Sequence, residues 1–292
     1  MRLGPQARRW LRCALPSSLR RASQPLHLLQ AGWQPGVAPS RLQATFAMVT
    51  GLVTLCLASG GAAETASRSA DAHLLEARFA VPTTHYPHGV LGDRIEYSAM
   101  TLRDSQGRVF RIDLRSRGPV FEDLSPRLWD VTADGAPEAV VVESDPEKGA
   151  QLAVYGLQDG AVRKIAATPH IGTRFRWLAP IAAADLDGDG HIEVAYIDRP
   201  HLAKTLRVWR YRDGKLHELA QAGGLTNHRI GEDFITSGLR RCGDKPELIT
   251  VDAGWARIMA TAFEAGELVS RDIGAFSRAH GLAAALQCND PE

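Results

Sequence analysis

The hydrophobic pattern of the chain repeats three times, and each copy has the same form. A glutamate is followed by four strand-forming residues and then by an acidic residue. The three glutamates, Glu138, Glu193 and Glu247, lie 55 and 54 residues apart. A fixed period of this length is the signature of a repeat architecture, so the pattern predicts a protein built of stacked, similar units.

Each copy continues in the same way, because a turn signal follows its glutamate after about twenty residues. These signals are Asp159-Gly160, Asp213-Gly214 and Ala265-Gly266, and short runs of β-forming residues flank them. Two β runs joined by such a pair are typical of a β-hairpin. A weaker fourth copy begins at Glu96 and reaches Gly118.

A unit of about fifty residues that contains several strands is typical of a β-propeller blade. We therefore predict an all-β fold, a β-propeller-like array of about four to five four-stranded blades. One such sheet cannot bury both of its faces alone, so neighbouring sheets must cover it. The predicted domain spans residues 74–288, with repeats around 126–165, 180–219 and 235–273 and a weak copy around 90–120.

One segment carries specific chemistry, and we call it the acidic loop, from Asp185 to Glu193. It has carboxylates at its positions 1, 3, 5 and 9 and a glycine at position 6. Four carboxylates so close together repel one another without a cation, and Ca²⁺ takes roughly six to eight oxygen ligands. The loop therefore predicts a divalent-cation site, and the alternative is an acidic surface turn that stays empty. An EF-hand needs a glutamate at position 12, where this chain has Tyr196.

The acidic loop, followed by an apolar strand, resembles the calcium loop of FG-GAP repeats, which are also described as integrin-α-type or VCBS-like. The resemblance extends over about residues 126–273 and implies loops placed between the strands of β-propeller blades. It also implies a set of Ca²⁺ ligands, namely Asp185, Asp187, Asp189, the backbone carbonyl of His191, and Glu193.

The other two copies depart from this loop pattern. The first, from Asp130 to Glu138, has Thr132 at position 3. Threonine offers only a neutral oxygen, so we expect metal binding there to be weaker or absent. The third copy has Leu239 and Gly243 where the first and third aspartates should stand, and we assign it no metal.

The first 63 residues differ in composition from the rest of the chain. They contain seven arginines, no lysine and no acidic residue, and their apolar core runs from about 46 to 58. Such a core is too short to span a bilayer, and small residues follow it, which is typical of a signal peptide cleaved near Ala63. A mitochondrial transit peptide is the alternative, because the leader is rich in arginine. We expect export to the periplasm or the extracellular space, with residues 64–73 as a short linker.

Charge and cysteine content narrow the class of protein further. After the leader, 27 basic and 33 acidic residues remain, which disfavours a nucleic-acid partner. No later segment is apolar enough to suggest a membrane span.

Two cysteines, Cys242 and Cys288, lie outside the leader, and two lone cysteines in an oxidising compartment usually pair. We predict a disulfide between them, and the alternative is two unrelated buried thiols.

No common catalytic motif occurs in the chain, neither a nucleophile elbow nor a HExxH, P-loop or dinucleotide fingerprint. We therefore favour an exported, calcium-binding module that acts in binding or scaffolding, without catalysis of its own. Its partner would be a protein or a glycan, and we expect a monomer.

An enzyme is the alternative, because polar loops around the repeats carry His170, His201 and His228, with Arg174 and Asp233. If these side chains meet in one pocket, a periplasmic or secreted hydrolase or lyase gains support.

Overall fold

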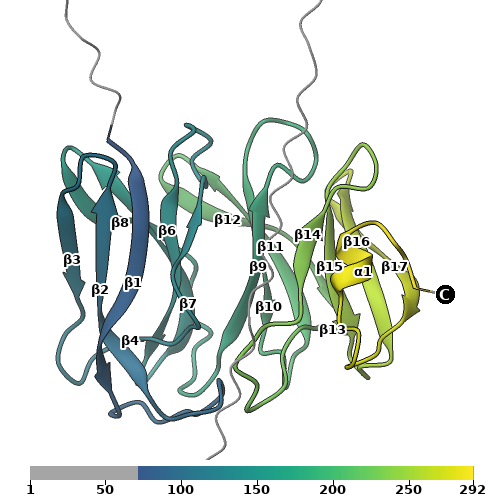
Figure 1. The fold of residues 1–292 in the computed structure, drawn as a ribbon, viewed down its shortest axis with the longest axis horizontal. Helices are drawn as coiled ribbons and strands as arrows, with labels where there is room; N and C mark the ends of the chain where they lie inside the picture. The colour runs from purple at the N-terminus through teal and green to yellow at the C-terminus, as the bar shows by residue number, and fades with distance from the viewer. Residues whose placement is uncertain (1–71, 292) are drawn as a thin grey trace, which may run out of the picture. The chain divides into compact units, whose positions relative to one another are not determined.

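The computed structural model describes residues 72–291, and most of them lie in β-strands or in the loops between strands (Figure 1). The prediction of an all-β fold is confirmed. The described residues contain one helix, α1 (Ala283–Leu286), which is a single turn near the C-terminal end. Across this part of the chain, no helix is both long and apolar enough to cross a membrane. The predicted signal peptide lies outside the described residues.

The strands form three sheets, and the first combines eight strands. Its order is β1-β2-β4-β6-β7-β8, with β3 paired to β2 and β5 paired to β6. Its strands are β1 (Leu74–Thr83), β2 (Glu96–Asp104), β3 (Val109–Asp113), β4 (Val120–Phe121), β5 (Arg127–Trp129), β6 (Glu138–Asp145), β7 (Gly149–Gln158) and β8 (Ala161–Ala167).

The second and third sheets are smaller. The second has the order β12-β11-β10-β9, and the third has the order β13-β15-β16-β17 with β14 paired to β15. Their strands are β9 (Leu178–Ala184), β10 (Glu193–Asp198), β11 (Thr205–Arg212), β12 (Lys215–Gly223), β13 (Leu225–Thr226), β14 (Gly238–Arg240), β15 (Glu247–Asp252), β16 (Arg257–Glu264) and β17 (Glu267–Ala275).

Three antiparallel meanders, β5–β8, β9–β12 and β14–β17, run through the three sequence copies. The last two strands of each are joined by the two-residue turn that the sequence predicted. Both residues of Asp159-Gly160 have positive φ, at 50° and 73°, as a type I′ hairpin turn requires. The first sheet begins with β1–β3, so it adds β1 ahead of the weak copy expected around 90–120. Among the described residues no sheet closes on itself, and the number of blades stays a prediction.

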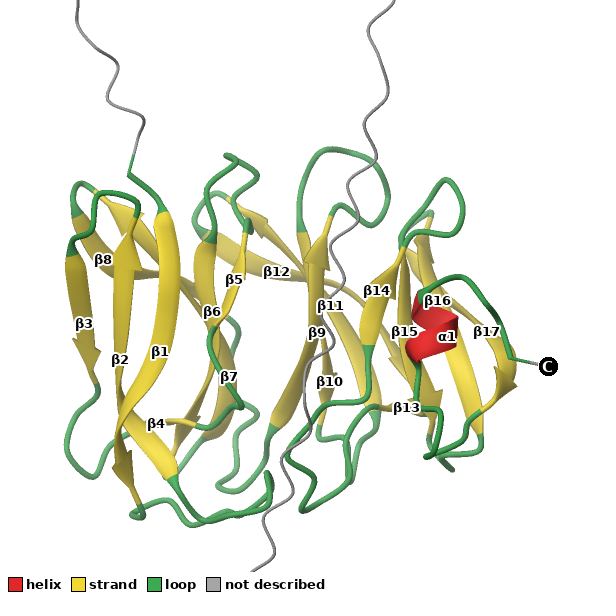
Figure 2. Cartoon of the chain, viewed as in Figure 1, coloured by secondary structure: helices red, strands yellow, loops and turns green. Residues whose placement is uncertain are grey.

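The second strand of each meander is buried on both faces. Side chains alternate between the two faces of a strand, so Val140 and Val142 of β6 enter the core shared with β9 and β10. Ala139 and Val141 enter the core shared with β1 and β2. Strand β10 divides its residues in the same way between the cores on its two sides. This arrangement explains why an unbroken apolar run follows each glutamate, and Figure 2 shows the strands side by side with loops at both ends.

The last sheet has no further sheet beyond it in the described chain, and the C-terminal segment covers it instead. Leu282 and Ala285 of this segment complete the core of β15–β17. The guanidinium of Arg240, whose side chain is 1% exposed, pairs with Glu247 at 2.9 Å and also with Asp290.

The predicted disulfide is confirmed, and it fixes this covering segment. Cys242 and Cys288 are bonded, with their Cα atoms 5.4 Å apart and a sequence separation of 46. Close packing at the end of the segment also explains Gly274. A Cβ on that residue would lie 2.1 Å from the backbone oxygen of Pro291, so no larger residue fits.

Replacing Cys242 and Cys288 together by serine should lower the free energy of unfolding. The chain-entropy description assigns about 4 kcal/mol to a ring of this length, and strain often reduces the realised value. Urea unfolding of the oxidised protein and of the double variant measures the difference. Equal stabilities would show that the bond does not hold the C-terminal segment in place.

Candidate functional site

The acidic loop joins β9 to β10, and Asp185 organises its backbone. The Oδ1 atom of Asp185 accepts a hydrogen bond from the Gly188 amide at 2.7 Å, and its Oδ2 atom accepts one from the Gly190 amide at 2.9 Å. Gly188 and Gly190 have φ of 85° and 87°, a conformation that glycine adopts without strain. The two glycines therefore let the loop fold around one carboxylate.

Glu193 begins β10 and closes the loop from the other side. Its side chain is fully buried, and its Oε2 atom accepts a hydrogen bond from the Leu186 amide at 2.8 Å. Burial raises the pKa of Glu193, while the hydrogen bonds from Leu186 and Arg210 act to lower it. Leu186 is itself buried in the core between the second and third sheets. The glutamate and the leucine thus hold the loop against the protein.

Three of the five predicted metal ligands come together in the structure. One carboxylate oxygen each from Asp185, Asp187 and Glu193 lie within 4.8 Å of one another. Asp189 is outside this group, and no described contact brings the carbonyl of His191 into it. The donors are hard carboxylate oxygens, which suit Ca²⁺ or Mg²⁺.

A feature that the sequence analysis missed is a guanidinium inside the acidic loop. Arg210 of β11 contacts three carboxylates, at 2.8 Å for Asp187, 2.6 Å for Asp189 and 2.6 Å for Glu193. In the sheet, Arg210 lies directly opposite Glu193 on the neighbouring strand. The register of β10 with β11 sets this pair, and the Asp213-Gly214 turn fixes only the register of β11 with β12, so no turn signal in the sequence indicated it. The guanidinium of Arg210 therefore supplies positive charge to the carboxylates of the acidic loop.

In the first repeat, the buried glutamate is partnered by hydrogen bonds from its own loop and not by an arginine. Glu138, which corresponds to Glu193, accepts hydrogen bonds from the Val131 amide at 2.7 Å and from the Thr132 hydroxyl at 3.0 Å. Gly156 lies beside Glu138, since a Cβ on this glycine would be 3.5 Å from the Glu138 Cγ atom, and it has no side chain to enter the loop. Thr132 is therefore bound to the glutamate and is not free to face a metal.

In the third repeat, arginines from β14 and β17 replace the loop contacts altogether. Glu247 pairs with Arg240 at 2.9 Å and with Arg271 at 2.8 Å. The glutamate that begins the second strand is thus partnered in all three repeats, by a different group each time.

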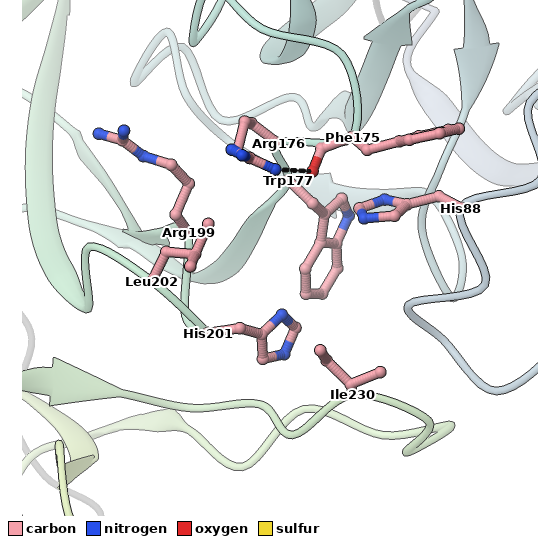
Figure 3. Close-up of a pocket in the computed structure, with 8 residues that line it drawn as sticks. All are labelled: His88, Phe175, Arg176, Trp177, Arg199, His201, Leu202 and Ile230. Carbon is pink, nitrogen blue, oxygen red and sulfur yellow. Dashed lines mark hydrogen bonds between the residues drawn. The ribbon is translucent and has the colours of Figure 1, made fainter.

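A pocket lies beyond the opposite end of β10, where the strand ends at Asp198, and we call it the loop-face pocket. It has a volume of about 200 Å³ (Figure 3). Four loops contribute to it, those between β1 and β2, β8 and β9, β10 and β11, and β13 and β14. The residues that line it are His88, Phe175, Arg176, Trp177, Arg199, His201, Leu202 and Ile230.

The loop-face pocket gathers part of the predicted histidine and arginine cluster. His201 lies on the pocket wall, and its Nε2 atom is 3.0 Å from the Nδ1 atom of His228. His170 is not in this pocket; its Nδ1 atom contacts the Gly149 carbonyl at 2.8 Å, and the residue lines a neighbouring hollow. Arg174 packs over the Phe175 ring at 4.4 Å instead of lining the pocket. Asp233 is exposed and does not line it.

Trp177 and His88 are central to this pocket, although the enzyme alternative expected only His170, His201 and His228 as the histidines of its site. The indole Nε1 of Trp177 donates a hydrogen bond to the Glu122 carbonyl at 2.8 Å. The Nδ1 atom of His88 lies 2.5 Å from a carboxylate oxygen of Glu122, whose side chain is fully buried. The Glu122 carboxylate also accepts a hydrogen bond from the Ser144 hydroxyl. These partners are far apart in sequence, so no local motif marks them.

Comparison with known proteins identifies the repeat. Residues 130–196 match the family model described as FG-GAP-like repeat, a range that begins in the first loop and includes the whole acidic loop. This segment of the chain is an FG-GAP-like repeat. No match is found among curated proteins.

Among solved structures, the chain is similar to a crystal structure of an exo-β-1,3-galactanase from Phanerochaete chrysosporium with β-1,3-galactotriose. Sequence identity is 13% and the TM-score is 0.37. The match covers 70% of this chain and 49% of that chain, so it spans about half the length of the galactanase structure.

Replacing Arg210 by methionine should destabilise the metal-free protein. The change leaves the buried Glu193 without its charged partner, and Asp187 and Asp189 without the guanidinium that contacts them, which costs about 3–5 kcal/mol. Arg257→Met is the matched control, because the Arg257–Asp272 pair is exposed and should contribute little to stability. Urea unfolding of both variants after metal removal measures the difference. Equal losses would show that Arg210 has no special role in the acidic loop.

Proposed function

We propose that the protein is an exported, calcium-stabilised binding module of the β-propeller type, with four to five blades and no catalysis of its own. The convergence of four loops on the loop-face pocket is the observation that carries this proposal. The loops come from all three sheets, so stacking of the sheets shapes a surface that no single repeat has. Such concave sites, apolar with a few polar groups, are typical of ligand binding.

Calcium belongs to the proposal through the acidic loop. Asp185, Asp187, Asp189, Glu193 and the His191 carbonyl would hold the ion, which supplies positive charge among the carboxylates. Arg210 now occupies three of these four carboxylates, so Ca²⁺ has to displace a guanidinium in order to bind. We therefore expect the site to take calcium at the higher concentrations found outside cells. The disulfide between Cys242 and Cys288 supports the same compartment, because such bonds persist in oxidising surroundings.

A hydrolase or lyase in the periplasm or outside the cell is the second candidate. Two imidazoles, those of His88 and His201, line one pocket, and each has a hydrogen-bonding partner on its other ring nitrogen. Imidazoles oriented in this way are the usual groups for proton transfer. A binding module remains the first choice because the sequence contains no recognised catalytic motif.

Calcium should raise the melting temperature of metal-stripped protein. A ligand that binds only the folded state stabilises it by about 2.7 kcal/mol at a hundredfold excess over the Kd. Arg210→Met should increase the calcium response, because the competing cation is gone. Asp187→Ala should remove most of the response, whereas Thr132→Ala should change it little. Melting curves that calcium leaves unshifted in both the wild type and Arg210→Met would contradict the calcium site.

The fate of a captured ligand distinguishes the two candidate functions. Protein immobilised with and without a chelator is incubated with peptides and glycans released from the native cell envelope, and mass spectrometry follows both bound and unbound molecules. A binding module returns its ligand with an unchanged mass. Cleaved products that disappear in a His88→Phe variant would establish the hydrolase or lyase instead.

A further inference from the structure

The loop-face pocket carries a positive charge that no acidic residue of the described chain neutralises. Arg176 lines the pocket, and its Nη1 atom donates a hydrogen bond to the Phe175 carbonyl at 3.1 Å. Among residues 72–291 it forms no ion pair. Arg199, on the same pocket, differs because two hydrogen bonds of 2.8 and 2.9 Å join it to Asp198. Arg176 is therefore the group that favours an anionic ligand.

A chain of two histidines fixes the proton positions on the opposite wall. The Nε2 atom of His228 lies 2.9 Å from the Glu232 carbonyl, and a carbonyl only accepts, so the proton of His228 sits on Nε2. Burial lowers the pKa of His228, which keeps the ring neutral and leaves a lone pair on Nδ1. His201 must then donate to that lone pair through its own Nε2 atom, across 3.0 Å.

It follows that the Nδ1 atom of His201 is an acceptor without a proton. Burial lowers the pKa of His201 to about 4, so the ring is neutral at physiological pH. Nε2 already carries the one proton of the neutral ring, and Nε2 rather than Nδ1 makes the hydrogen bond to the His228 ring. A ligand in the pocket can therefore donate a hydrogen bond to His201, and it cannot accept one from this atom.

Trp177 and His88 hold these walls in place before any ligand arrives. The Trp177 ring is stacked on His201, with centroids 6.4 Å apart, and it meets His228 edge-on at 4.9 Å. Its indole is hydrogen-bonded to the backbone of Glu122, the residue whose carboxylate holds His88. Both sides of the pocket are thus joined through one buried tryptophan.

The rim of the pocket adds an apolar surface. Leu202 is 62% exposed and Ile230 is 71% exposed, although both are large aliphatic side chains. They line the same pocket as Arg176 and His201. Apolar groups placed beside a free guanidinium suit a ligand that has both an apolar body and a negative charge.

We propose that the loop-face pocket binds a carboxylate that carries an aliphatic group and a hydrogen-bond donor. The carboxylate pairs with Arg176, the donor N–H or O–H reaches the Nδ1 atom of His201, and the aliphatic group packs on Leu202 and Ile230. This proposal rests on the proposed binding function and names its ligand class. Two sources share this chemistry, namely the C-terminal residue of a peptide and a free 2-hydroxy acid.

Four small probes test the proposal on the full protein by NMR, with the indole N–H signal of Trp177 as the reporter. N-acetyl-leucine represents a peptide C-terminus, and 2-hydroxy-4-methylpentanoate represents a free hydroxy acid. N-acetyl-leucinamide lacks the carboxylate, and 4-methylpentanoate lacks the donor. We expect one or both of the first two probes to bind, and each control probe to bind about tenfold more weakly or worse. The tighter of the first two identifies the source.

Variants assign the contacts. Arg176→Met should weaken carboxylate binding about tenfold or more. Arg174→Met is the matched control, because that guanidinium is also unpaired among the described residues but does not line the pocket, and it should change the affinity little. His201→Phe keeps an aromatic ring without the acceptor, so it should remove the preference for 2-hydroxy-4-methylpentanoate over 4-methylpentanoate. An unchanged calcium response and an intact NMR spectrum show that each variant is folded.

Equal binding of N-acetyl-leucine and its amide would overturn the proposal, as would an equal effect of the Arg174 and Arg176 substitutions. Absence of carboxylate binding in folded wild-type protein would also overturn it, while leaving the broader binding function and the calcium loop to their own tests. Conversely, carboxylate binding without any calcium response would contradict the calcium part of the proposed function alone.

Discussion

The structure depends on one constraint, which is that its central strands have two apolar faces. A strand such as β10 places alternate residues on opposite sides, and both sets are buried. Burying a large aliphatic side chain contributes roughly 1.5–3 kcal/mol, so a lone four-stranded sheet would leave much of this stabilisation unrealised. Adjacent sheets cover the second apolar face. On the last sheet, the disulfide-bonded C-terminal segment covers it instead. Stacking then determines where every loop lies.

The second recurring requirement is a partner for the glutamate that begins these strands, which is buried in the first two repeats and half-buried in the third. An unpaired buried carboxylate is costly, and each repeat satisfies it with different groups. Loop amides and a threonine serve Glu138, loop amides and Arg210 serve Glu193, and two arginines serve Glu247. The glutamate is therefore structural in origin, and the acidic loop of the second repeat adds the carboxylates of the proposed metal site to an anchor that all three repeats share.

The sequence predicted what depends on local pattern. Period, hairpin turns, the all-β class and the FG-GAP-like repeat could be recognised from residues close together or regularly spaced. The disulfide could be predicted because two cysteines follow the leader and have no other evident partner. The candidate site was predicted only in part, because its contacts join residues from different repeats. Arg210 enters the acidic loop through strand register, and His88 meets Glu122 across 34 residues. His170 seemed equivalent to His201 in sequence, yet it faces a different hollow, since loop conformation and not spacing directs each side chain.

Native-state hydrogen exchange tests most directly whether the sheets form one stacked unit. The amides of Val141, Ala195 and Ile249 lie in the central strands of three successive repeats, all fully buried. Because each strand relies on neighbouring sheets for cover, all three should exchange only by global unfolding, with one free energy and one urea dependence. A lower free energy and a smaller urea dependence at any one of them would show that its sheet opens alone. That result would contradict the account.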